Sequence, residues 1–305
     1  MFEFTKMQGA GNDFIVINNM KLKIDIDRLP SIARHLCQRR ISIGANALMV
    51  ADFPENGGDF KMRFYNADGT IAEMCGNGAR CLARYAYDEG FARESMTIET
   101  LAGNVFAQKI NDSIYKIKLN NPSEIKLNLN IEIDENKYCC DYIELGKPGI
   151  PHAVIKYENL GNTDDKAIYD LGNKIRHFSG FSKGANVNFY EITEDNKIIV
   201  KTFERGVEDF TLACGTGSGS VATAIAIKNE VKRDSQIEVT VPGGKLFIDI
   251  DFIEKSNEIR SLYLSGETKI VYRGLIADEF QWKMKVNKER SLWTVNSEGN
   301  VPNGT

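Results

Sequence analysis

The sequence predicts an α+β protein of two pseudo-symmetric domains, each a curved, mostly antiparallel sheet wrapped around a central helix. Three observations predict this fold class. The chain carries a weak internal repeat, its short β-type runs outnumber its helical runs, and its 305 residues suit about two domains. Because each domain would hold roughly 150 residues, each can bury a core of its own.

The internal repeat is clearest around two cysteines. Segment 63–78 aligns with segment 202–217, and Phe64 lies as far before Cys75 as Phe203 lies before Cys214. In both segments the cysteine precedes a glycine-rich turn and then an alanine-rich apolar run. A long internal period of this kind implies one structural unit used twice. The two thiols are therefore expected in equivalent sites.

Strands are predicted where short apolar runs alternate with polar residues. In the first half they fall at 2–7, 14–18, 47–51, 60–65, 96–100 and 114–119. In the second half they fall at 142–145, 153–157, 187–192, 198–203, 237–241, 246–250 and 262–264. A further alternating run at 280–286 could add one strand, and residues beyond 296 are predicted to form a frayed tail.

Helices are predicted at about 30–39, 77–89, 165–177 and 216–229. Pro30 suits the first helical position. Behind Cys75, apolar residues recur at the spacing of one helix face, which predicts an amphipathic helix; they are Ala79, Leu82, Ala83 and Ala86. Behind Cys214 the run 221–227 is apolar nearly all round, which predicts a buried helix.

Composition excludes several functional classes. A net charge of −4, with 26% charged and 42% hydrophobic residues, gives no electrostatic footprint for nucleic acid and favours a small-molecule partner. The N-terminus lacks the pattern of a secretory signal, and no apolar run is long enough to span a bilayer, so a cytoplasmic location without membrane contact is expected. Six cysteines without a CxxC pair suit free thiols. Three widely separated histidines give little support for a metal site.

The two cysteines suit proton transfer at carbon. A cysteine just before a helix lies near unpaired amides and the positive end of the helix dipole, which is expected to lower the thiol pKa from roughly 8.5. Gly76 and Gly215 leave the amides open to a carboxylate. One sulfur would remove a proton while the other returns one to the opposite face, and the product would be inverted. The scheme needs no cofactor.

Other interpretations of these residues remain. A single cysteine at a helix start is usually a small buried hydrophobe, although two in matched frames argue against that reading. The glycine turns could hold phosphate, but neither a P-loop nor a complete dinucleotide fingerprint is present. Thiol redox chemistry and non-catalytic amino-acid binding also stay open. The remaining cysteines and two of the histidines are expected in packing or surface roles, whereas His152, in the counterpart of the Gly11–Asn12 turn, could equally face the site or cap a strand.

The sequence resembles the diaminopimelate epimerase family, whose members are pyridoxal-phosphate-independent amino-acid epimerases and racemases. The resemblance runs from about Phe4 to Gly274. It rests on KMQGAGNDF at 6–14, on MRFYNADG at 62–69 followed by AEMCGNGARC at 72–81, and on FERG at 203–206 with LACGTG at 212–217. Several long motifs in the family's order make the match specific.

The resemblance implies a role for each matched residue. Cys75 and Cys214 look like the acid/base pair, and the loops with amides for the α-carboxylate look like Gly76, Asn77, Gly215 and Thr216. Further substrate contacts look like Asn12, Asn66, Asn188, Glu204 and Arg205, and the internal repeat adds His152 as a candidate contact. The forked guanidinium of Arg205 suits a distal carboxylate.

The family's fold also implies a domain division. It assigns 1–119 to the first domain, together with a returning strand at about 268–277, and 120–267 to the second, leaving 278–305 as a partly disordered C-terminal extension. The sequence Asn-Asn-Pro-Ser at 120–123 interrupts the strand pattern where this junction falls. Family members are commonly dimers, so a homodimer is expected.

The chain departs from the family pattern in three places. It reads Gly44-Ala-Asn-Ala47 where the family usually reads Gly-Ala-Asp-Gly, and Gly149-Ile-Pro-His152 where the family often reads Gly-Asn-Pro-His. It also continues well past Gly274. The first two departures lie near the expected pocket for the substrate side chain. The leading hypothesis is an epimerase of LL- and meso-2,6-diaminopimelate, and the alternative is a racemase of another amino acid with the same two-thiol chemistry.

Overall fold

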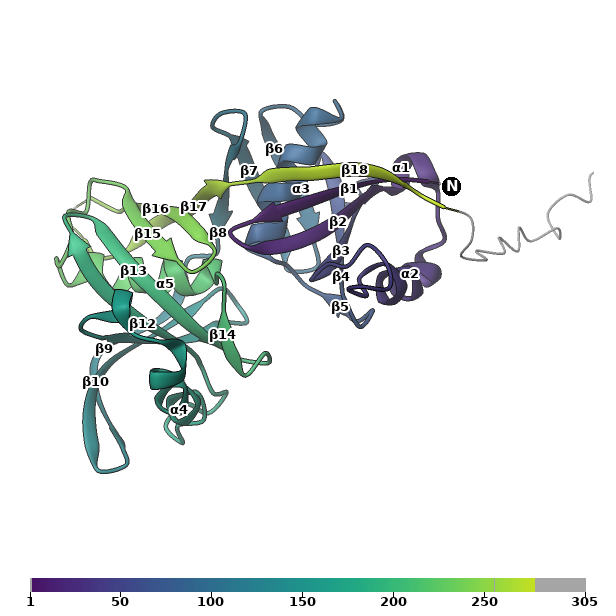
Figure 1. Cartoon of the computed structure of the whole chain (residues 1–305). Helices are drawn as coiled ribbons and strands as arrows, with labels where there is room; N and C mark the ends of the chain where they lie inside the picture. The colour runs from purple at the N-terminus through teal and green to yellow at the C-terminus, as the bar shows by residue number, and fades with distance from the viewer. Residues whose placement is uncertain (1, 255, 278–305) are drawn as a thin grey trace, which may run out of the picture.

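The computed structural model describes residues 2–254 and 256–277, which form an α+β fold of two pseudo-repeated halves (Figure 1). The first half holds β1 (Phe2–Gly9), β2 (Asn12–Asn18), α1 (Asn19–Leu22), α2 (Leu29–Leu36), β3 (Ala47–Asp52), β4 (Phe60–Asn66), β5 (Ile71–Ala72), α3 (Gly76–Asp88), β6 (Ser95–Thr100), β7 (Gly103–Lys109) and β8 (Ile114–Leu119). The second half holds β9 (Pro122–Ile133), β10 (Asn136–Leu145), β11 (Ile150–Lys156), α4 (Asp165–Arg176), β12 (Asn186–Glu194), β13 (Lys197–Glu204), β14 (Asp209–Thr211), α5 (Gly215–Ile227), β15 (Ile237–Val241), β16 (Gly244–Phe252) and β17 (Ile259–Glu267). The last described strand is β18 (Lys269–Ile276).

The two halves repeat the same order of strand pairing. In the first half β18, β1, β2, β3, β4, β6, β7 and β8 pair in that order, and only β2–β3 and β4–β6 are parallel. In the second half the order is β9, β10, β11, β12, β13, β15, β16 and β17, and only β11–β12 and β13–β15 are parallel. The predicted pseudo-symmetric α+β fold is confirmed.

Strand β18 completes the first half from the far end of the sequence. It leaves β17 and runs antiparallel to β1, with Phe2 opposite Ile276 (Figure 1). In the second half β9 holds the equivalent place beside β10. The halves are also joined by the antiparallel pair β8–β17. The two halves are therefore linked by β18, which returns from β17 to β1, and by the β8–β17 pair.

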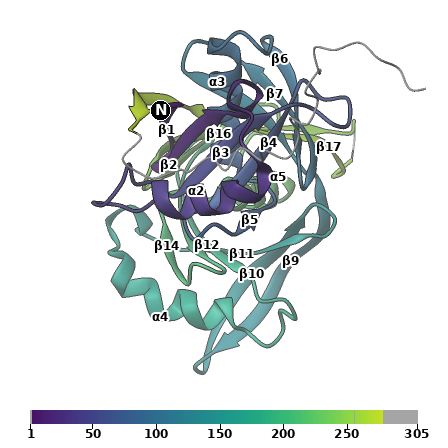
Figure 2. The same cartoon turned by 90° about the vertical axis from the view of Figure 1, so that its right-hand side faces the viewer.

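Each half wraps its sheet around one helix, α3 in the first and α5 in the second. Helix α4 instead lies on the outside of the second half (Figure 2). Helix α5 is buried without interruption from Gly217 to Ala226, as its apolar run predicts. Helix α3 buries the predicted apolar face at Ala79, Leu82, Ala83 and Ala86. It also buries Arg80 completely, which an amphipathic pattern does not predict.

Several elements differ from the sequence prediction. Strands β5, β7, β9 and β14 are additional. The alternation of Ile131 and Ile133 with acidic residues would have revealed β9, but the proline and asparagines before it suggested only a junction. Helix α2 ends at Leu36 rather than at 39 because Gly44 and Ala45 turn back to bond the carbonyls of Leu36 and Cys37. The strand expected at 280–286 and the tail beyond 296 lie outside the described residues.

Candidate active site

Each of the two cysteines caps the N-terminus of a central helix. Cys75 is the N-cap of α3 and Cys214 is the N-cap of α5, and both have extended backbone conformations. Short strands, β5 and β14, pair with β4 and β13 just before each cysteine. The extended residue followed by a glycine-started helix is what the glycine-rich turns predict. Both thiols are free.

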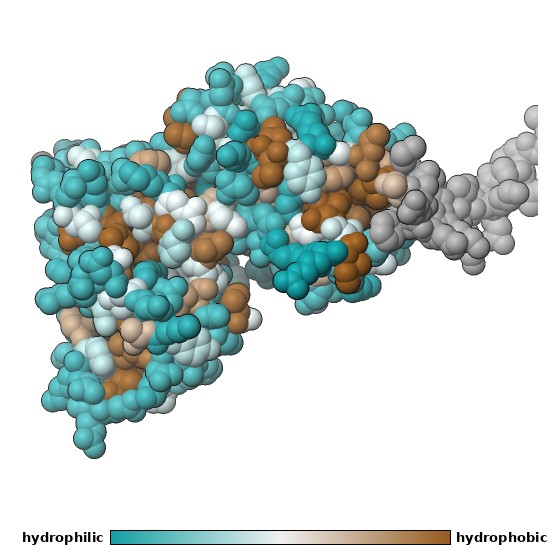
Figure 3. Space-filling view, viewed as in Figure 1, coloured by the Kyte–Doolittle hydropathy of each residue, from teal (hydrophilic) through white to brown (hydrophobic). Residues whose placement is uncertain are grey.

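The two helix N-termini meet beside one residue of β17. A side-chain Cβ at Gly76 would lie 3.3 Å from Leu264 Cδ2, and a Cβ at Gly215 would lie 2.7 Å from the same atom. The space-filling view shows the surface hollowed between the two halves, and β5 and β14 lie on either side of this hollow (Figure 3). The two cysteines therefore belong to one centre, although they are far apart in the sequence.

Asn12 and Asn77, both predicted as substrate contacts, lie together at this centre. Asn77 Nδ2 donates to Asn12 Oδ1 at 2.8 Å and also lies 3.5 Å from the carbonyl oxygen of Ala213, the residue before Cys214. The turn before Asn12 also touches the second half. Gly11 has φ of 84°, and a Cβ there would lie 2.8 Å from Leu212 Cδ1, so only glycine fits this turn.

Asn188 and His152 form a second group, buried in the second half. Asn188 is fully buried, and its Oδ1 accepts a hydrogen bond from Thr202 Oγ1 at 3.0 Å. Its Nδ2 lies 3.2 Å from His152 Nδ1 and donates to the carbonyl of Ala153. A Cβ at Gly217 would lie 2.2 Å from Asn188 Oδ1, which places Asn188 directly against the first turn of α5.

His152 is a neutral group at physiological pH. Burial, reinforced by the positive charge of Arg205, lowers the pKa of His152 to about 3. Its Nε2 is buried and has no hydrogen-bond partner among the described residues. The fully buried imidazole beside Asn188 suits a neutral donor or acceptor rather than a proton carrier, and its place in the substrate site stays a prediction.

Glu204 and Arg205 stand at the end of β13. Burial raises the pKa of Glu204, and its charge acts on both Cys75 and Cys214. Arg205 is held by its backbone amide, which donates to Asn186 Oδ1 at 2.9 Å, and by its Nη1, which donates to the Lys183 carbonyl at 3.1 Å. The charge of one partly buried carboxyl thus acts on both thiols, and the anchored guanidinium of Arg205 follows it in the chain.

The other predicted site residues differ in whether they lie beside a cysteine. Thr216 Oγ1 lies 3.5 Å from the sulfur of Cys214, beside Gly215. Asn66 instead hydrogen-bonds Thr70 within the turn before β5, through Nδ2 to Oγ1 at 3.0 Å. Its described hydrogen bonds do not join it to either cysteine. The roles suggested for these residues stay predictions.

Burial, more than the helix N-terminus, decides the protonation of the two thiols. Burial raises the pKa of the Cys214 thiol to about 12, against the opposing effects of Thr216 and the Gly217 amide. Burial also raises the pKa of the Cys75 thiol, against the opposing effect of the Gly78 and Asn77 amides. The expected net lowering of the thiol pKa is therefore wrong for the surroundings that the described residues provide, because loss of hydration outweighs the helix amides.

Sequence reasoning missed four residues that shape this centre: Arg80, Asn186, Thr202 and Leu264. Asn186 and Thr202 carry a sequence signal, since each is a polar residue two positions before a predicted site residue in the same strand. Leu264 gives none, because an apolar residue in a strand is ordinary. Arg80 gives only a weak one, as a charge within an apolar helical run.

Two departures from the family pattern now have positions. Asn46 is exposed, and its Oδ1 accepts a hydrogen bond from the backbone amide of Asp13 at 3.0 Å. Asn46 therefore supports the start of β2, where Asn12 lies. Ile150 begins β11 and is 38% exposed, two residues before the buried His152.

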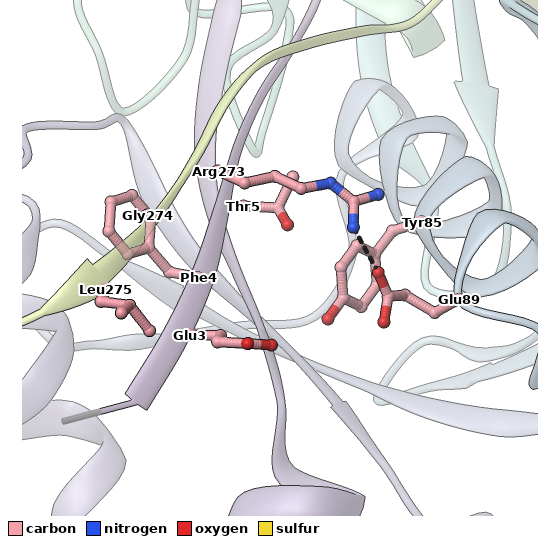
Figure 4. A pocket seen from close by; sticks show the side chains of 8 residues that line it. All are labelled: Glu3, Phe4, Thr5, Tyr85, Glu89, Arg273, Gly274 and Leu275. Atoms are coloured by element: carbon pink, nitrogen blue, oxygen red, sulfur yellow. Dashed lines mark hydrogen bonds and ion pairs between the residues drawn. The ribbon is translucent and has the colours of Figure 1, made fainter.

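The cavities and side-chain clusters described outside this centre give little support for a second reactive site. A cavity of about 300 Å³ lies between β1, β18 and the end of α3, where Arg273 pairs with Glu89 and no thiol lines the wall (Figure 4). Among the described residues, no cluster of histidine, cysteine or carboxylate side chains suits a metal ion. No helix in the described part of the chain is long and apolar enough to cross a membrane.

Comparison with solved structures defines the class to which this architecture belongs. A probable proline racemase from Agrobacterium radiobacter is similar with a TM-score of 0.66 and 14% identity, covering 91% of this chain and 93% of that chain. A hydroxyproline epimerase from Agrobacterium vitis is similar with a TM-score of 0.64 and 15% identity, covering 90% of each chain. A Bacillus anthracis phenazine biosynthesis protein is similar with a TM-score of 0.69 and 14% identity, covering 90% of this chain and 99% of that chain. The chain shares its fold with these three proteins.

Sequence comparison then gives the family. Residues 4–119 and 146–271 match the family described as diaminopimelate epimerase. The diaminopimelate epimerase of Aquifex aeolicus is 35% identical over 286 residues, which are 91% of this chain and 98% of the relative. That of Methanothrix thermoacetophila is 36% identical over 285 residues, which are 91% of this chain and 96% of the relative. The chain belongs to the diaminopimelate epimerase family and is an isomerase.

Proposed function

We propose that this enzyme interconverts LL- and meso-2,6-diaminopimelate by a cofactor-independent mechanism that uses Cys75 and Cys214 as acid and base. The observation that carries the proposal is the meeting of two cysteine-capped helix N-termini beside Leu264. A carboxylate bound between these ends would receive amides from both helices. The α-carbon would then lie between the two sulfurs.

The proposed reaction needs one thiolate and one thiol at the same time. The thiolate removes the α-proton from one face, the helix amides stabilise the negative charge that spreads onto the carboxylate, and the thiol on the other face delivers its proton. The carbon is inverted and the two sulfurs exchange protonation states. Burial of Cys214 and partial burial of Cys75 suit this scheme, because water that reached the carbanion would compete for the proton.

We assign the distal end of the substrate to the second half. Arg205 has a planar fork that suits a carboxylate, and its contacts with Asn186 and Lys183 hold it near the end of β13. The proposed further polar contacts with the substrate are Asn12, Asn66, Asn77, Asn188, Glu204 and His152. Thr216 is proposed to act with the glycine turns. Neutral amides can hold an amino or carboxylate group without adding charge to the buried centre.

The test is solvent exchange in deuterated water. Incubation with LL-diaminopimelate should place deuterium at one α-carbon and yield the meso form, read by NMR and chiral chromatography. Exchange with another amino acid but not with diaminopimelate would favour the alternative, a racemase of that amino acid. Binding without exchange would indicate a non-catalytic binding protein, and consumption of thiols or peroxide would indicate a redox enzyme.

We also propose a cytoplasmic homodimer. Six free cysteines suit a reducing compartment. Val271 and Leu275 on β18 are 51% and 60% exposed, and among the described strands β18 has a pairing register only with β1. Apolar residues are visible on the half of the surface that carries β1 and β18 (Figure 3). An edge strand with exposed apolar side chains suits contact with a second copy.

A further inference from the structure

Arg80 is a buried charge without a described counter-ion. It lies on α3, is 0% exposed, and its Nε and Nη1 have no hydrogen-bond partner in the part of the chain that the structure describes. Its Nη2 donates to Asn77 Oδ1 at 2.9 Å. The groups whose charge acts on Arg80 are the thiols of Cys81 and Cys75. Since an unpaired buried charge is costly, a functional reason for it is expected.

The second half has no equivalent charge. The internal repeat aligns Arg80 with Gly219 on α5. A Cβ at Gly219 would lie 2.9 Å from Leu119 Cδ1, so apolar packing fills the place that a longer side chain would need. The two helices therefore present matched cysteines but differ in the charge behind them.

We propose that Arg80 is a positioning residue that supplies positive charge to Cys75 and not to Cys214, so that Cys75 holds the thiolate when the two sulfurs of the substrate-free enzyme share one proton. The proposal rests on the proposed function, in which one sulfur must be deprotonated. It identifies which sulfur that is. The symmetry of the fold alone cannot make that choice.

Hydrogen bonds act at both sulfurs, from two helix amides at Cys75 and from one amide and the Thr216 hydroxyl at Cys214, and the carboxylate charge that acts on the thiols is shared by them. Glu204, from β13, acts on both cysteines and disfavours both thiolates. The Cys75 charge acts on Cys214, which disfavours a second thiolate once the first has formed. Burial raises the pKa of both thiols, and Arg80 opposes that rise at Cys75. Arg80 is thus the described charge that separates them.

Arg80 also fixes the orientation of Asn77. A guanidinium only donates hydrogen bonds, so it must face the amide oxygen of Asn77. The amide nitrogen then points to Asn12 and to the Ala213 carbonyl. The same side chain therefore sets the charge at Cys75 and the contact between the two halves.

The experiment measures the pH at which each thiol reacts in the substrate-free, full-length enzyme. Short pulses of iodoacetamide across a pH series are read for each cysteine by peptide mass spectrometry, with the exposed Cys139 as internal reference. The midpoint in pH is compared rather than the rate, because Cys75 and Cys214 differ in exposure. Arg80→Gln removes the charge but can still donate to Asn77, and Arg80→Lys keeps the charge. The matched control is Arg84→Gln, which removes a guanidinium of α3 that bonds the Thr268 carbonyl.

In the wild type, the midpoint of Cys75 should lie below that of Cys214. Arg80→Gln should raise the Cys75 midpoint by about one pH unit or more, which is about a tenfold slower reaction at fixed lower pH, and leave that of Cys214 nearly unchanged. Arg80→Lys and Arg84→Gln should stay close to the wild type. Equal midpoints in the wild type, or an unchanged Cys75 midpoint in Arg80→Gln, would overturn the proposal.

Turnover gives a second and separate measurement. The acid limb of kcat/KM against pH reports the essential base of the free enzyme, so Arg80→Gln should move that limb upward by the same amount as the Cys75 midpoint. A purely structural role would lower Tm without moving the limb. If the wild type exchanged no α-proton of any amino acid, the proposed function would fail. The alkylation midpoints would still decide whether Arg80 separates the two thiols.

Discussion

At the residue scale, two opposing effects meet at each thiol. The helix N-terminus favours the thiolate, whereas burial disfavours it, and burial prevails at both Cys75 and Cys214. A substrate carboxylate and ammonium group would change this balance on binding. The site therefore suits a reaction in which the thiolate is used only while it is shielded from water.

Replacing either cysteine tests the two-thiol mechanism. Cys75→Ser and Cys214→Ser should each lower kcat/KM by about a hundredfold or more, because a hydroxyl is a far weaker acid than a thiol and cannot replace it in proton transfer. The epimer ratio after incubation with LL-diaminopimelate gives the rate. Cys139→Ser, at an exposed cysteine of β10, should keep full activity. Retention of most activity by either active-site variant would contradict the mechanism.

His152 predicts a specific loss of stability in acid. The folded-state pKa of about 3 lies below the ordinary histidine value of 6.5, so between these values the unfolded chain binds a proton that the folded chain does not. The stabilising effect is present above pH 6.5 and declines as the pH falls towards 3. One such group contributes a slope of up to about 1.4 kcal/mol per pH unit.

Denaturant unfolding at pH 7 and at pH 4.5 measures this effect. The difference in free energy of unfolding between the two values should shrink in His152→Gln, whatever the stability of the variant at pH 7. His177→Gln, at an exposed histidine after α4, should show the wild-type difference. An unchanged difference in His152→Gln would mean that His152 does not titrate below its unfolded value.

At the element scale, the two central helices begin with the same spacing of cysteine and glycine but pack against different neighbours. The third residue of each helix is glycine, at 78 in α3 and 217 in α5. A Cβ at Gly78 would lie 2.8 Å from the sulfur of Met49, while a Cβ at Gly217 would lie 2.2 Å from Asn188 Oδ1. Met49 is flexible and Asn188 is held by Thr202 and Ala153.

These surroundings predict unequal effects from the same substitution. Gly217→Ala should displace Asn188 and lower kcat/KM by about tenfold or more, with a loss of roughly 1–3 kcal/mol in free energy of unfolding. Gly78→Ala should cost less, because the end of the Met49 side chain can move. Steady-state kinetics and denaturant unfolding of the two variants give the comparison. Equal effects, or a larger effect at Gly78, would show that Asn188 is not the constraint.

At the scale of the whole molecule, β18 ties the end of the described chain to its beginning. We propose that residues 1–119 with the strand at 268–277 form one domain and that 120–267 form the other. The equivalent positions of β18 beside β1 and of β9 beside β10 support this division. The centre lies where the two halves meet, so movement of one half against the other would open or close it.

The exposed edge of β18 predicts the oligomeric state of the chain. The double variant Val271→Lys/Leu275→Lys should convert a dimer into a monomer, because two charges would be buried in the proposed interface. Light scattering after size-exclusion chromatography measures the mass. Leu101→Lys, which adds a charge at an exposed leucine between β6 and β7, should stay dimeric. A wild type that is monomeric, or a double variant that stays dimeric, would contradict this interface.

Much of the fold was predictable because its signals are local. Alternation and helical spacing identify most strands and all four longer helices, and the repeat predicts the two halves. Short β5 and β14 escaped because two or three residues hold too little pattern. The ends of helices differed because tertiary contacts, such as that of Gly44 with Leu36, end them earlier.

The candidate site likewise has one part that the sequence predicts and one part that it does not. The sequence by itself determined the pairing of Cys75 with Cys214, since matched spacing and glycine turns are properties of the chain. Only the tertiary structure decided how each thiol ionises and which charge stands behind it, as Arg80 shows. Desolvation depends on every atom packed around a group, and those atoms come from strands far apart in the sequence. No local pattern contains that information.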